Sequence, residues 1–369
     1  MKKALIIGGG FAGCATAHQL ALLGGWDVTL VELAPFLGAG VRTRWYGGHP
    51  YTFGPRHFLT RDERLFDFLN KYVPLRRLDH LFLTYVEQDQ QFYNFPIHYD
   101  DIGRMPDREQ VLSELDGLPE EARATNLEDF WIQSVGKTLY EKFAKHYNQK
   151  MWLVDDNREI DANIPDWTSK GSLLYRGEQK NFHDSISAYP YSPNGYDEYF
   201  AIATAETRVL LGTKIEQFDI PNKTVRINGQ DQTFDVITST IAPDILFEHC
   251  YGELRFVGLD FFPIVLPMEQ CFPEDVFFLY YSGKEKFKRL VEYKKFTQHQ
   301  APTTLIGIEF PSMSGKHYTM PIEAEQSRAQ RYIDEMPEGV FSIGRAGSYR
   351  YIDIDDCIAQ AMDVAEKLK

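Results

Sequence analysis

The sequence predicts an α/β protein in which one domain, built from both ends of the chain, is interrupted by two inserted parts. Residues 4–33 have the pattern of a strand, a helix and a second strand, and residues 340–368 return to a strand and an amphipathic helix. Between these ends, residues 104–166 carry apolar side chains at helical spacing, whereas residues 255–310 contain several β-like runs. We therefore expect a helical lobe and an antiparallel β-sheet domain between the two halves of the α/β domain.

The first unit begins with the short apolar run 4–7, which is typical of a buried parallel strand. A helix is expected over 11–23, because Gly24 and Gly25 follow it and glycine readily takes the left-handed conformation that ends a helix. A second strand is expected over 27–33. This order of elements is the one that builds a parallel sheet.

Three glycines occupy the turn between the first strand and the helix, in the pattern Gly8-x-Gly10-x-x-Gly13. The first allows a tight turn, the second lets a pyrophosphate approach the backbone, and the third lets helix and strand pack closely. The start of the helix offers N–H groups and a partial positive charge to the phosphates. Glu32, near the end of the second strand, can accept a hydrogen bond from a free ribose hydroxyl and repels a 2′-phosphate. The motif predicts a Rossmann-like domain for FAD or NAD rather than NADP.

FAD is expected rather than NAD because the end of the chain returns to this domain. Residues 341–345 have the pattern of a strand that ends at Gly344 and leads through a loop into the last helix. That layout places a helix N-terminus near a bound flavin. The chain holds no second Gly-x-Gly-x-x-Gly pattern, which disfavours a reductase with paired domains for FAD and NAD(P)H.

The spacing of apolar residues and the residues typical of turns predict the elements between the two ends. A hairpin is expected over 81–95, several helices over 104–166, and ordered loops over 167–200, which are rich in Tyr, Ser, Gly, Pro and Asn. Residues 209–240 have the pattern of strands around a hairpin, with Asn228-Gly229 as its turn. We therefore divide the chain into an FAD-binding domain of residues 1–78, 202–244 and 324–369, a helical lobe of residues 100–166, and a β-sheet substrate domain of residues 79–99, 167–201 and 245–323.

Composition excludes several classes of partner. Lys and Arg total 39 against 53 Asp and Glu, and the formal charge of -14 disfavours nucleic acid and anionic membrane surfaces. The four cysteines have no Cys-x-x-Cys spacing, so no metal site is predicted and reduced thiols are expected. No apolar run reaches the ~18 residues of a membrane span. We expect a cytoplasmic protein that takes a small molecule, whose negative charge would need a local group of arginines.

Six segments carry a further pattern across nearly the whole chain: residues 8–13 with Glu32, residues 53–58, residues 92–96, residues 143–152, residues 289–296 and residues 344–353. In order and spacing they resemble the UDP-galactopyranose mutase family, flavoenzymes that interconvert the pyranose and furanose forms of a nucleotide sugar. The resemblance implies reduced FAD, whose N5 attacks the anomeric carbon and displaces the nucleoside diphosphate. It also implies a nucleotide-diphosphate sugar such as UDP-galactose as substrate, a role in surface polysaccharide synthesis, and a homodimer.

Site residues follow from the motif and the resemblance together. Catalytic or diphosphate-binding roles are implied for Arg289, Arg345, His57, Arg56 and Arg176. Contacts with FAD are implied for Gly8, Gly10, Phe11, Ala12, Gly13, Glu32, Leu33, Gly40, His57, Gly344, Arg345, Tyr351, Ile352, Asp353 and Ile354. Contacts with the substrate are implied for Phe143, Tyr147, Trp152, Tyr189, Asn94, Arg289, Phe310, Tyr318, Tyr349 and Tyr351.

Each of these assignments has a physical basis and a simpler alternative. Phe143 and Tyr147 lie four residues apart on one helix face and can flank a flat base, but such a pair is also common in cores. Guanidinium groups match phosphate oxygens, although Arg289 follows a Lys-rich run that is also compatible with a solvated face. Asp353 can simply cap the last helix, and His57 can be a hydrogen-bonded core histidine.

The chain departs from the family pattern at the sugar end. Arg56 stands where the family has its active-site histidine, and Phe310 stands where it has a tyrosine near the diphosphate. A second phosphate-binding arginine is expected near 174–184, where Leu174 matches best and Arg176 follows two residues later. These departures bear on the identity of the sugar more than on the type of reaction.

Two other functions remain open at this point. An FAD-dependent oxidoreductase of the amine-oxidase-like class shares the glycine motif and the inserted substrate domain, but does not explain Tyr147, Trp152, Arg289 and Arg345 together. A non-catalytic carrier with an FAD-type fold leaves the same arginines and tyrosines unexplained. Visible absorbance of the pure protein separates the carrier from the two flavoenzymes.

Overall fold

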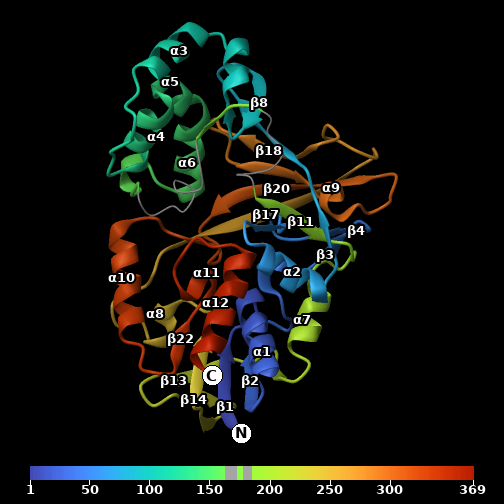
Figure 1. The fold of residues 1–369 in the computed structure, drawn as a ribbon, viewed down its shortest axis with the longest axis vertical. Coiled ribbons are helices and arrows are strands. Elements are labelled where there is room, and N and C mark those ends of the chain that lie inside the picture. Colours follow the sequence, from blue (N-terminus) through green and yellow to red (C-terminus); the bar gives the residue numbers. More distant parts are fainter. Residues whose placement is uncertain (163–172, 178–184) are drawn as a thin grey trace.

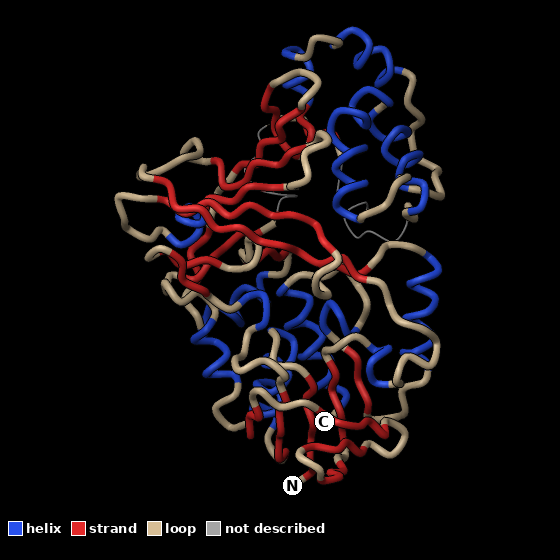
Figure 2. The backbone as a smooth tube through the Cα atoms, turned by 180° about the vertical axis from the view of Figure 1, so that it is seen from behind, coloured by secondary structure: helices blue, strands red, loops and turns tan. Residues whose placement is uncertain are grey.

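The computed structural model describes residues 1–162, 173–177 and 185–369 of the chain (Figure 1). Three parts follow one another along the long axis: an α/β domain that holds both termini, a large sheet, and a helical lobe. The view from behind shows the same order, with the helices of the lobe at the end opposite to the termini (Figure 2). The α/β class with two inserted parts is therefore confirmed.

The α/β domain contains a parallel sheet in the order β12-β2-β1-β16-β22. Its strands are β1 (Lys2–Ile7), β2 (Trp26–Val31), β12 (Arg208–Leu210), β16 (Val236–Ser239) and β22 (Val340–Ser342). Because β22 pairs with β16, which pairs with β1, the two ends of the chain share one sheet. Strand β2 ends two residues before the predicted end, so Glu32 and Leu33 lie beyond it.

Helices α1 (Phe11–Leu23) and α12 (Ile354–Lys367) pack against each other and share one hydrophobic core with the sheet. Ala12, Ala15 and Ala17 are buried on α1, and their small side chains let the neighbouring backbones come close. The prediction of a helix over 11–23 is confirmed, and the last helix ends one residue before its predicted end.

The prediction of loops over 167–200 is wrong for part of this range. The described residues include β10 (Leu174–Tyr175), β11 (Ile186–Pro190) and the start of α7 (Asp197–Ala203), whereas residues 163–172 and 178–184 lie outside the described part. Strand β11 pairs with β5 (Phe58–Thr60) and β6 (Leu75–Arg77), and α7 packs against α1. The segment therefore packs in the same core as α1, which its polar composition conceals.

The large sheet has the order β21-β17-β20-β19-β18-β7-β8. Its strands are β7 (Leu81–Val86), β8 (Gln91–Phe95), β17 (Phe256–Leu266), β18 (Val276–Tyr281), β19 (Arg289–Glu292), β20 (Thr304–Ser312) and β21 (Tyr318–Thr319). Neighbouring strands are antiparallel, except that β18 and β7 are parallel. The predicted hairpin over 81–95 is confirmed as β7 and β8.

The helical lobe is tied to the β7–β8 hairpin by a buried ion pair. Its helices are α3 (Arg108–Asp116), α4 (Leu127–Val135), α5 (Lys137–Leu139) and α6 (Lys145–Trp152), with a π-helical turn over Tyr140–Ala144. Lys142 in that turn is 3% exposed, and its Nζ lies 2.6 Å from Asp89 Oδ1 and 2.7 Å from Asp107 Oδ1. Asp89 lies in the hairpin turn, so this lysine fixes the lobe to the sheet.

The remaining elements connect these parts. They are β3 (Arg44–Tyr46), β4 (His49–Tyr51), α2 (Glu63–Tyr72), β9 (Ile97–His98), β13 (Ile215–Asp219), β14 (Thr224–Ile227), β15 (Gln230–Thr233), α8 (Pro243–Leu246), α9 (Tyr293–Thr297), α10 (Glu323–Asp334) and α11 (Gly344–Gly347). Asn228 and Gly229 join β14 to β15 with φ angles of 51° and 73°. Two consecutive positive φ angles are what a tight hairpin turn requires, so the predicted turn is confirmed.

Candidate active site

The glycine turn at the start of α1 has the geometry of a nucleotide-binding turn. A Cβ atom at Gly13 would lie 2.0 Å from the carbonyl oxygen of Gly8, so the close approach of helix and strand requires glycine. No side chain caps α1, whose N-cap residue is Gly10. The N–H groups of the first turn have no partner within a helix, which leaves them available to phosphate oxygens. The turn therefore fits the pyrophosphate of a dinucleotide.

Glu32 is fixed directly beside this turn. Its Oε2 accepts a hydrogen bond from the Gly9 N–H at 2.6 Å, and its Oε1 accepts one from the Ala34 N–H at 2.7 Å. Each carboxylate oxygen can still accept a further hydrogen bond, so the contact with a ribose hydroxyl stays a prediction. The neighbouring Leu33 is 69% exposed.

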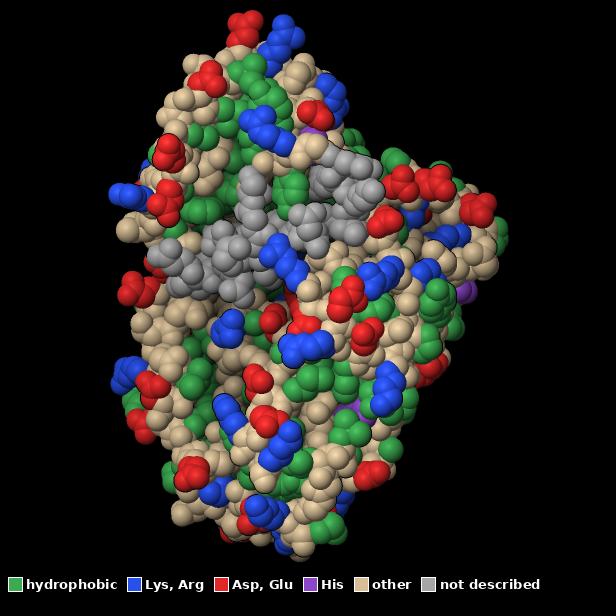
Figure 3. Space-filling model, viewed as in Figure 1, with side chains coloured by type: hydrophobic (Ala, Val, Ile, Leu, Met, Phe, Trp, Pro, Cys, Tyr) green, Lys and Arg blue, Asp and Glu red, His purple; other side chains and the backbone are tan. Residues whose placement is uncertain are grey.

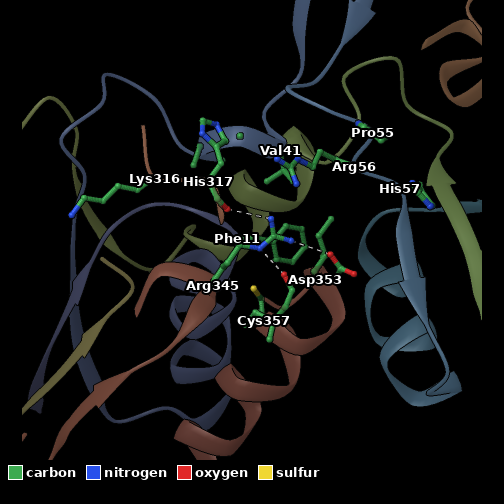
Figure 4. Close-up of a pocket in the computed structure, with 15 residues that line it drawn as sticks. Phe11, Val41, Pro55, Arg56, His57, Lys316, His317, Arg345, Asp353 and Cys357 are labelled. Atoms are coloured by element: carbon green, nitrogen blue, oxygen red, sulfur yellow. Dashed lines mark hydrogen bonds and ion pairs between the residues drawn. The ribbon is translucent and has the colours of Figure 1, made fainter. Parts of the chain in front are cut away.

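A cavity of about 190 Å³, here called the flavin-side cavity, opens beyond the glycine turn (Figure 4). Its lining comes from the start of α1, the loop after β2, the turn before β5, the segment before β21 with Lys316 and His317, and residues of α11, α12 and the segment between them. The predicted site residues on its walls are Phe11, Gly40, Arg56, His57, Arg345, Ile352, Asp353 and Ile354. Gly344 lies behind this wall, where an added Cβ would meet the Cβ of Ala12 at 3.0 Å.

Arg345 is held rigidly on the wall of this cavity. Its Nε donates to the carbonyl oxygen of Ile352 at 2.8 Å, and its Nη2 lies 3.1 Å from Asp353 Oδ1. The guanidinium lies 4.8 Å from the ring centre of Tyr351 and 5.4 Å from that of Tyr318. Asp353 is also the N-cap residue of α12, which confirms the capping role, whereas its contact with FAD stays a prediction.

Arg289 belongs to a buried cluster of charges next to this wall. Its Nη2 lies 2.6 Å from Glu309 Oε2, and the Nζ of Lys288 lies 3.5 Å from the same oxygen. Burial disfavours the charged guanidinium, but Glu309, together with Tyr280, Tyr318 and Tyr147, outweighs burial and raises the pKa of Arg289. Burial would raise the pKa of Glu309, yet Arg289 and Lys288 hold it below its ordinary value. Arg289 and Glu309 therefore stay charged.

Arg56 approaches the same cluster from the turn before β5. Its Nε donates to the carbonyl oxygen of Phe53 at 2.8 Å. A Cβ added at Gly54 would lie 3.8 Å from Arg56 Nη2 and 3.7 Å from Arg289 Nη2, so both guanidinium groups lie against this glycine. Figure 4 shows Arg56 reaching toward Val41, whereas the ring of His57 lies away from the other labelled residues. Arg56 therefore lies beside Arg289 in this cluster.

A second cavity of about 150 Å³, here called the aromatic pocket, lies between the helical lobe and the sheet. Its lining residues are Phe95, Pro96, Ile97, Trp131, Phe143, Ala144, Tyr147, Asn148, Met151, Leu173, Tyr280 and Tyr351. Tyr147 lies edge-on to Tyr280, with ring centres 5.7 Å apart, and burial raises the pKa of Tyr147. Tyr351 belongs to this pocket and contacts Arg345 of the flavin-side cavity, so the arginines lie between the two cavities.

Two other predicted substrate residues lie at the edge of the aromatic pocket. The Trp152 ring is 1% exposed and lies 6.2 Å from the Tyr351 ring and 6.4 Å from that of Tyr318. Asn94 precedes the pocket residue Phe95, and its N–H donates to Asp101 Oδ2 at 2.6 Å.

Phe310, Tyr349, Tyr189 and Arg176 are among the predicted site residues that line neither cavity. Phe310 follows Glu309 on β20 and points to the other face of the sheet, where it meets Phe262 with ring centres 5.4 Å apart. Tyr349 is fully buried, and its hydroxyl donates to the carbonyl oxygen of Arg255. Tyr189 is buried against Tyr196 and Phe296, and Arg176 lies over the Tyr99 ring at 3.7 Å.

His57 is a core residue as much as a cavity residue. Its ring stacks on Phe296 at 5.3 Å and lies edge-on to His80 at 5.1 Å. Among the described residues neither ring nitrogen has a hydrogen-bond partner, and burial, followed by the charges of His80, Arg289 and Arg56, lowers the pKa of His57 well below its usual value. The ring is therefore neutral. It is buried, as a core histidine would be, but within the described part of the chain it lacks the hydrogen bond that this alternative also assumed.

Lys288 and Glu309 are site residues that the sequence reasoning missed. Lys288 stands in a Lys-rich run that looks solvated, yet it is 2% exposed. Glu309 is fully buried near the end of an apolar strand. A carboxylate is rarely buried without a partner, so a lone Glu in an apolar run was the available signal.

Comparison with known proteins identifies the family. The model of the UDP-galactopyranose mutase family matches residues 142–351, more than half of the chain. The chain belongs to the UDP-galactopyranose mutase family. A model of an NAD(P)-binding Rossmann-like domain matches residues 6–72. The resemblance inferred from the sequence is therefore confirmed.

Relatives and a solved structure of this family align over nearly the whole chain. A probable UDP-galactopyranose mutase of Klebsiella pneumoniae is 23% identical over 99% of this chain and 94% of its own length. A dTDP-fucopyranose mutase of Escherichia coli is 23% identical over 99% of this chain and 98% of its own length. A crystal structure of reduced UDP-galactopyranose mutase superposes with a TM-score of 0.85 at 16% identity, covering 100% of this chain and 95% of that one.

Family membership makes the chain an isomerase of the mutase type with FAD as its cofactor, as the sequence predicted. Among the described residues, no group of three His, Cys, Asp or Glu side chains could hold a metal ion. No described helix is long and apolar enough to cross a membrane.

Proposed function

We propose that this enzyme interconverts the pyranose and furanose forms of a nucleoside-diphosphate sugar. The observation that carries the proposal is the group of cations between the aromatic pocket and the flavin-side cavity. Four positive side chains, Arg56, Lys288, Arg289 and Arg345, lie near two carboxylates, Glu309 and Asp353. The excess of two positive charges matches the two negative charges of a diphosphate diester.

The charge of the site differs from that of the molecule around it. The chain carries a formal charge of -14, and acidic and basic side chains are interspersed over the face seen in Figure 3. A buried excess of positive charge is costly unless an anion completes it. Arg289 and Arg345 can each offer two N–H groups to phosphate oxygens, a geometry that a lysine cannot provide.

The two cavities supply the surroundings for the two ends of such a substrate. In the proposed arrangement the base lies in the aromatic pocket near Phe143 and Tyr147, because aromatic rings stack on any flat base. The sugar then points toward the flavin-side cavity, past Arg345. Arg56 reaches this end of the site, where the family pattern has a histidine.

The residues around the flavin-side cavity fit FAD. The uncapped start of α1 would hold the pyrophosphate and Glu32 the adenosine ribose, with Gly40, Ile352 and Ile354 on the cavity walls. Bound in its reduced form, FAD supplies N5 as the nucleophile for the anomeric carbon. The protein's own part is to hold the nucleoside diphosphate while the bond to the sugar is broken and remade.

The cations do most for catalysis when the diphosphate separates from the sugar. Negative charge on its oxygens grows at that moment, so fixed positive groups stabilise the separated state more than the intact substrate. Burial among apolar residues strengthens this effect. The arginines also keep the diphosphate beside the sugar, so that it is present when the ring has closed in its other form.

UDP-galactose or a related nucleotide-diphosphate sugar is the proposed substrate. The names of the two relatives refer to UDP-galactopyranose and dTDP-fucopyranose, so the base and the sugar both vary among related enzymes. We place the product in surface polysaccharide synthesis and expect a cytoplasmic homodimer, in line with the resemblance noted in the sequence.

The deciding experiment offers a panel of UDP- and dTDP-sugars to the dithionite-reduced enzyme and separates the products by chromatography. We expect furanose product from at least one sugar, with no net consumption of reductant. Stoichiometric consumption of reductant during turnover would instead indicate an oxidoreductase of the amine-oxidase-like class. A colourless protein that FAD does not reconstitute would contradict both.

A further inference from the structure

Lys288 is a buried lysine with an unusual set of neighbours. Its Nζ lies 3.2 Å from the hydroxyl of Tyr318, 3.3 Å from Met151 Sδ and 3.5 Å from Glu309 Oε2. The side chain therefore contacts β20, β21 and the helix of the aromatic pocket at once. A lysine with so little exposure pays a large desolvation cost, which its contacts must offset.

The contact with Tyr318 has a definite direction. An ammonium group has only donors, so the oxygen of Tyr318 must accept the hydrogen bond from Lys288. The phenol proton of Tyr318 is then directed elsewhere. The Tyr318 ring is stacked on Tyr351 at 5.7 Å with an angle of 15° and lies beside Arg345, so it contacts one lining residue of each cavity and its orientation is fixed.

We propose that Lys288 is a positioning residue that orients the hydroxyl of Tyr318, so that this phenol donates its proton in a hydrogen bond to the bound diphosphate. The inference rests on the proposed function, since it takes a nucleoside diphosphate as the ligand. It assigns to Lys288 an indirect role, through Tyr318, beyond its contribution of positive charge.

The charges around Tyr318 make the donor sensitive to pH. The groups that face it are Lys288 just before β19, Arg289 on β19, Glu309 on β20, Arg56 before β5, Arg345 on α11, and the neighbours His317 and Tyr351. Burial raises the pKa of Tyr318 and Glu309 adds to this, but Lys288, Arg56 and Arg289 outweigh both and lower it to about 8.

The nearby titratable neighbours do not change charge in that range. Burial, with Arg56 and Lys288, lowers the pKa of His317 to about 4, so this ring is neutral. Burial raises the pKa of Tyr351, which also stays neutral. Below pH 8 the neutral Tyr318 donates to the diphosphate, whereas above pH 8 the phenolate repels it. Affinity for a nucleoside diphosphate should then fall about tenfold per pH unit above pH 8, because one proton is linked to binding.

The first test needs no ligand. Tyrosine ionisation is followed by absorbance at 295 nm in the full-length, FAD-loaded protein, and the trace of Tyr318→Phe is subtracted so that the flavin and the other tyrosines cancel. We expect one ionisation with a midpoint near pH 8, which Lys288→Met moves upward by at least one pH unit. Lys286→Met removes an exposed lysine of the same run and should leave the midpoint unchanged. A midpoint near 10 in the wild type, or no shift in Lys288→Met, would overturn the proposal.

The second test measures UDP binding by calorimetry from pH 7.5 to 9.5. We expect the wild type to lose about tenfold in affinity per pH unit above pH 8, Tyr318→Phe to lose this dependence, and Lys288→Met to show it only at a higher pH. Tyr318→Phe removes one oxygen atom only, so it tests the proposal even where Lys288→Met does not fold. If Lys288 contributed only its charge, Lys288→Met would weaken binding and yet keep the pH dependence of the wild type, which contradicts the proposal. A wild type that binds no UDP at pH 7.5 would contradict the proposed function, while the absorbance titration would still report on the pair.

Discussion

Arg345 and Arg289 are the two arginines expected to hold the diphosphate, although Asp353 and Ile352 fix the first and Glu309 fixes the second. We expect Arg345→Ala and Arg289→Ala to lower kcat by roughly a hundredfold, the scale of one lost charge-stabilising group in an active site. Arg345→Lys should restore only part of the lost kcat, because a lysine cannot make the paired contacts of a guanidinium. The measurement is steady-state kinetics with reduced enzyme of known flavin content.

The control for the arginine variants is Arg64→Ala, which removes a side chain that is 89% exposed. Arg289→Ala also leaves Glu309 buried with one partner fewer, so the combination Arg289→Ala with Glu309→Gln separates lost catalysis from a lost ion pair. Near-normal kcat in both single variants, fully loaded with FAD, would mean that the diphosphate is bound elsewhere, with Arg56 and Arg176 as the next candidates.

Glu32 joins the glycine turn to the cofactor, and its replacement tests that link. Glu32→Ala should weaken FAD binding by ~1–3 kcal/mol, because charged hydrogen bonds to the ribose are lost. The N–H groups of Gly9 and Ala34 lose their acceptors at the same time. Glu32→Gln keeps one acceptor oxygen, so its FAD affinity should lie between those of the wild type and Glu32→Ala. The measurement is flavin release followed by fluorescence. Unchanged affinity in Glu32→Ala would remove this residue from the site.

At the scale of elements, the strand–helix–strand unit depends on one close contact. Gly13→Ala would place a methyl group against the carbonyl oxygen of Gly8, and the Gly8 backbone and the Ile6 side chain leave it no room. We expect a loss of ~1–3 kcal/mol in the free energy of unfolding, with reduced flavin content, because α1 must move away from β1. Gly103→Ala is the matched control, since an added Cβ there meets nothing within 4 Å. Equal melting temperatures for the two variants would contradict this interpretation of the turn.

The elements that could be predicted are those whose signals lie in a few adjacent residues. The glycine turn, the helix that follows it and the Asn-Gly hairpin each follow from a few adjacent residues. Strand β11 was not predicted because its burial comes from β5 and β6, which lie more than a hundred residues away in the chain. The same limit applies to the site: Lys288 is buried by Met151, Glu309 and Tyr318, and no pattern in its own run reports those neighbours.

The resemblance to a family predicted which segments of the chain lie close together. It was less successful in predicting which way single side chains point. It brought Arg289, Arg345, Tyr147 and Tyr351 to one region of the molecule, as the structure has them. Phe310 lies on the other face of β20 because neighbouring residues of a strand alternate. Which of two adjacent residues faces a ligand is thus decided by strand register, and a shift of one position reverses it.

At the scale of the whole molecule, the electric field has opposite signs far from the site and within it. The formal charge of -14 repels a doubly negative substrate at long range, whereas the cations of the site attract it over a few ångströms. Added salt shortens the screening length from about 30 Å at 0.01 M to about 8 Å at 0.15 M. Long-range repulsion should therefore weaken before the local attraction does.

We expect the association rate constant of UDP to rise, by about twofold or more, between 0.01 and 0.15 M sodium chloride. This is the reverse of the usual behaviour of a binding pair with opposite charges. Stopped-flow fluorescence of the FAD-loaded protein measures the rate, and uridine, which carries no charge, is the matched ligand whose rate should stay constant. A fall in the UDP rate with salt would show that the cations of the site control the approach as well as the bound state. The net charge of the chain would then have no part in selecting its substrate, and the affinity would depend on the site cluster alone.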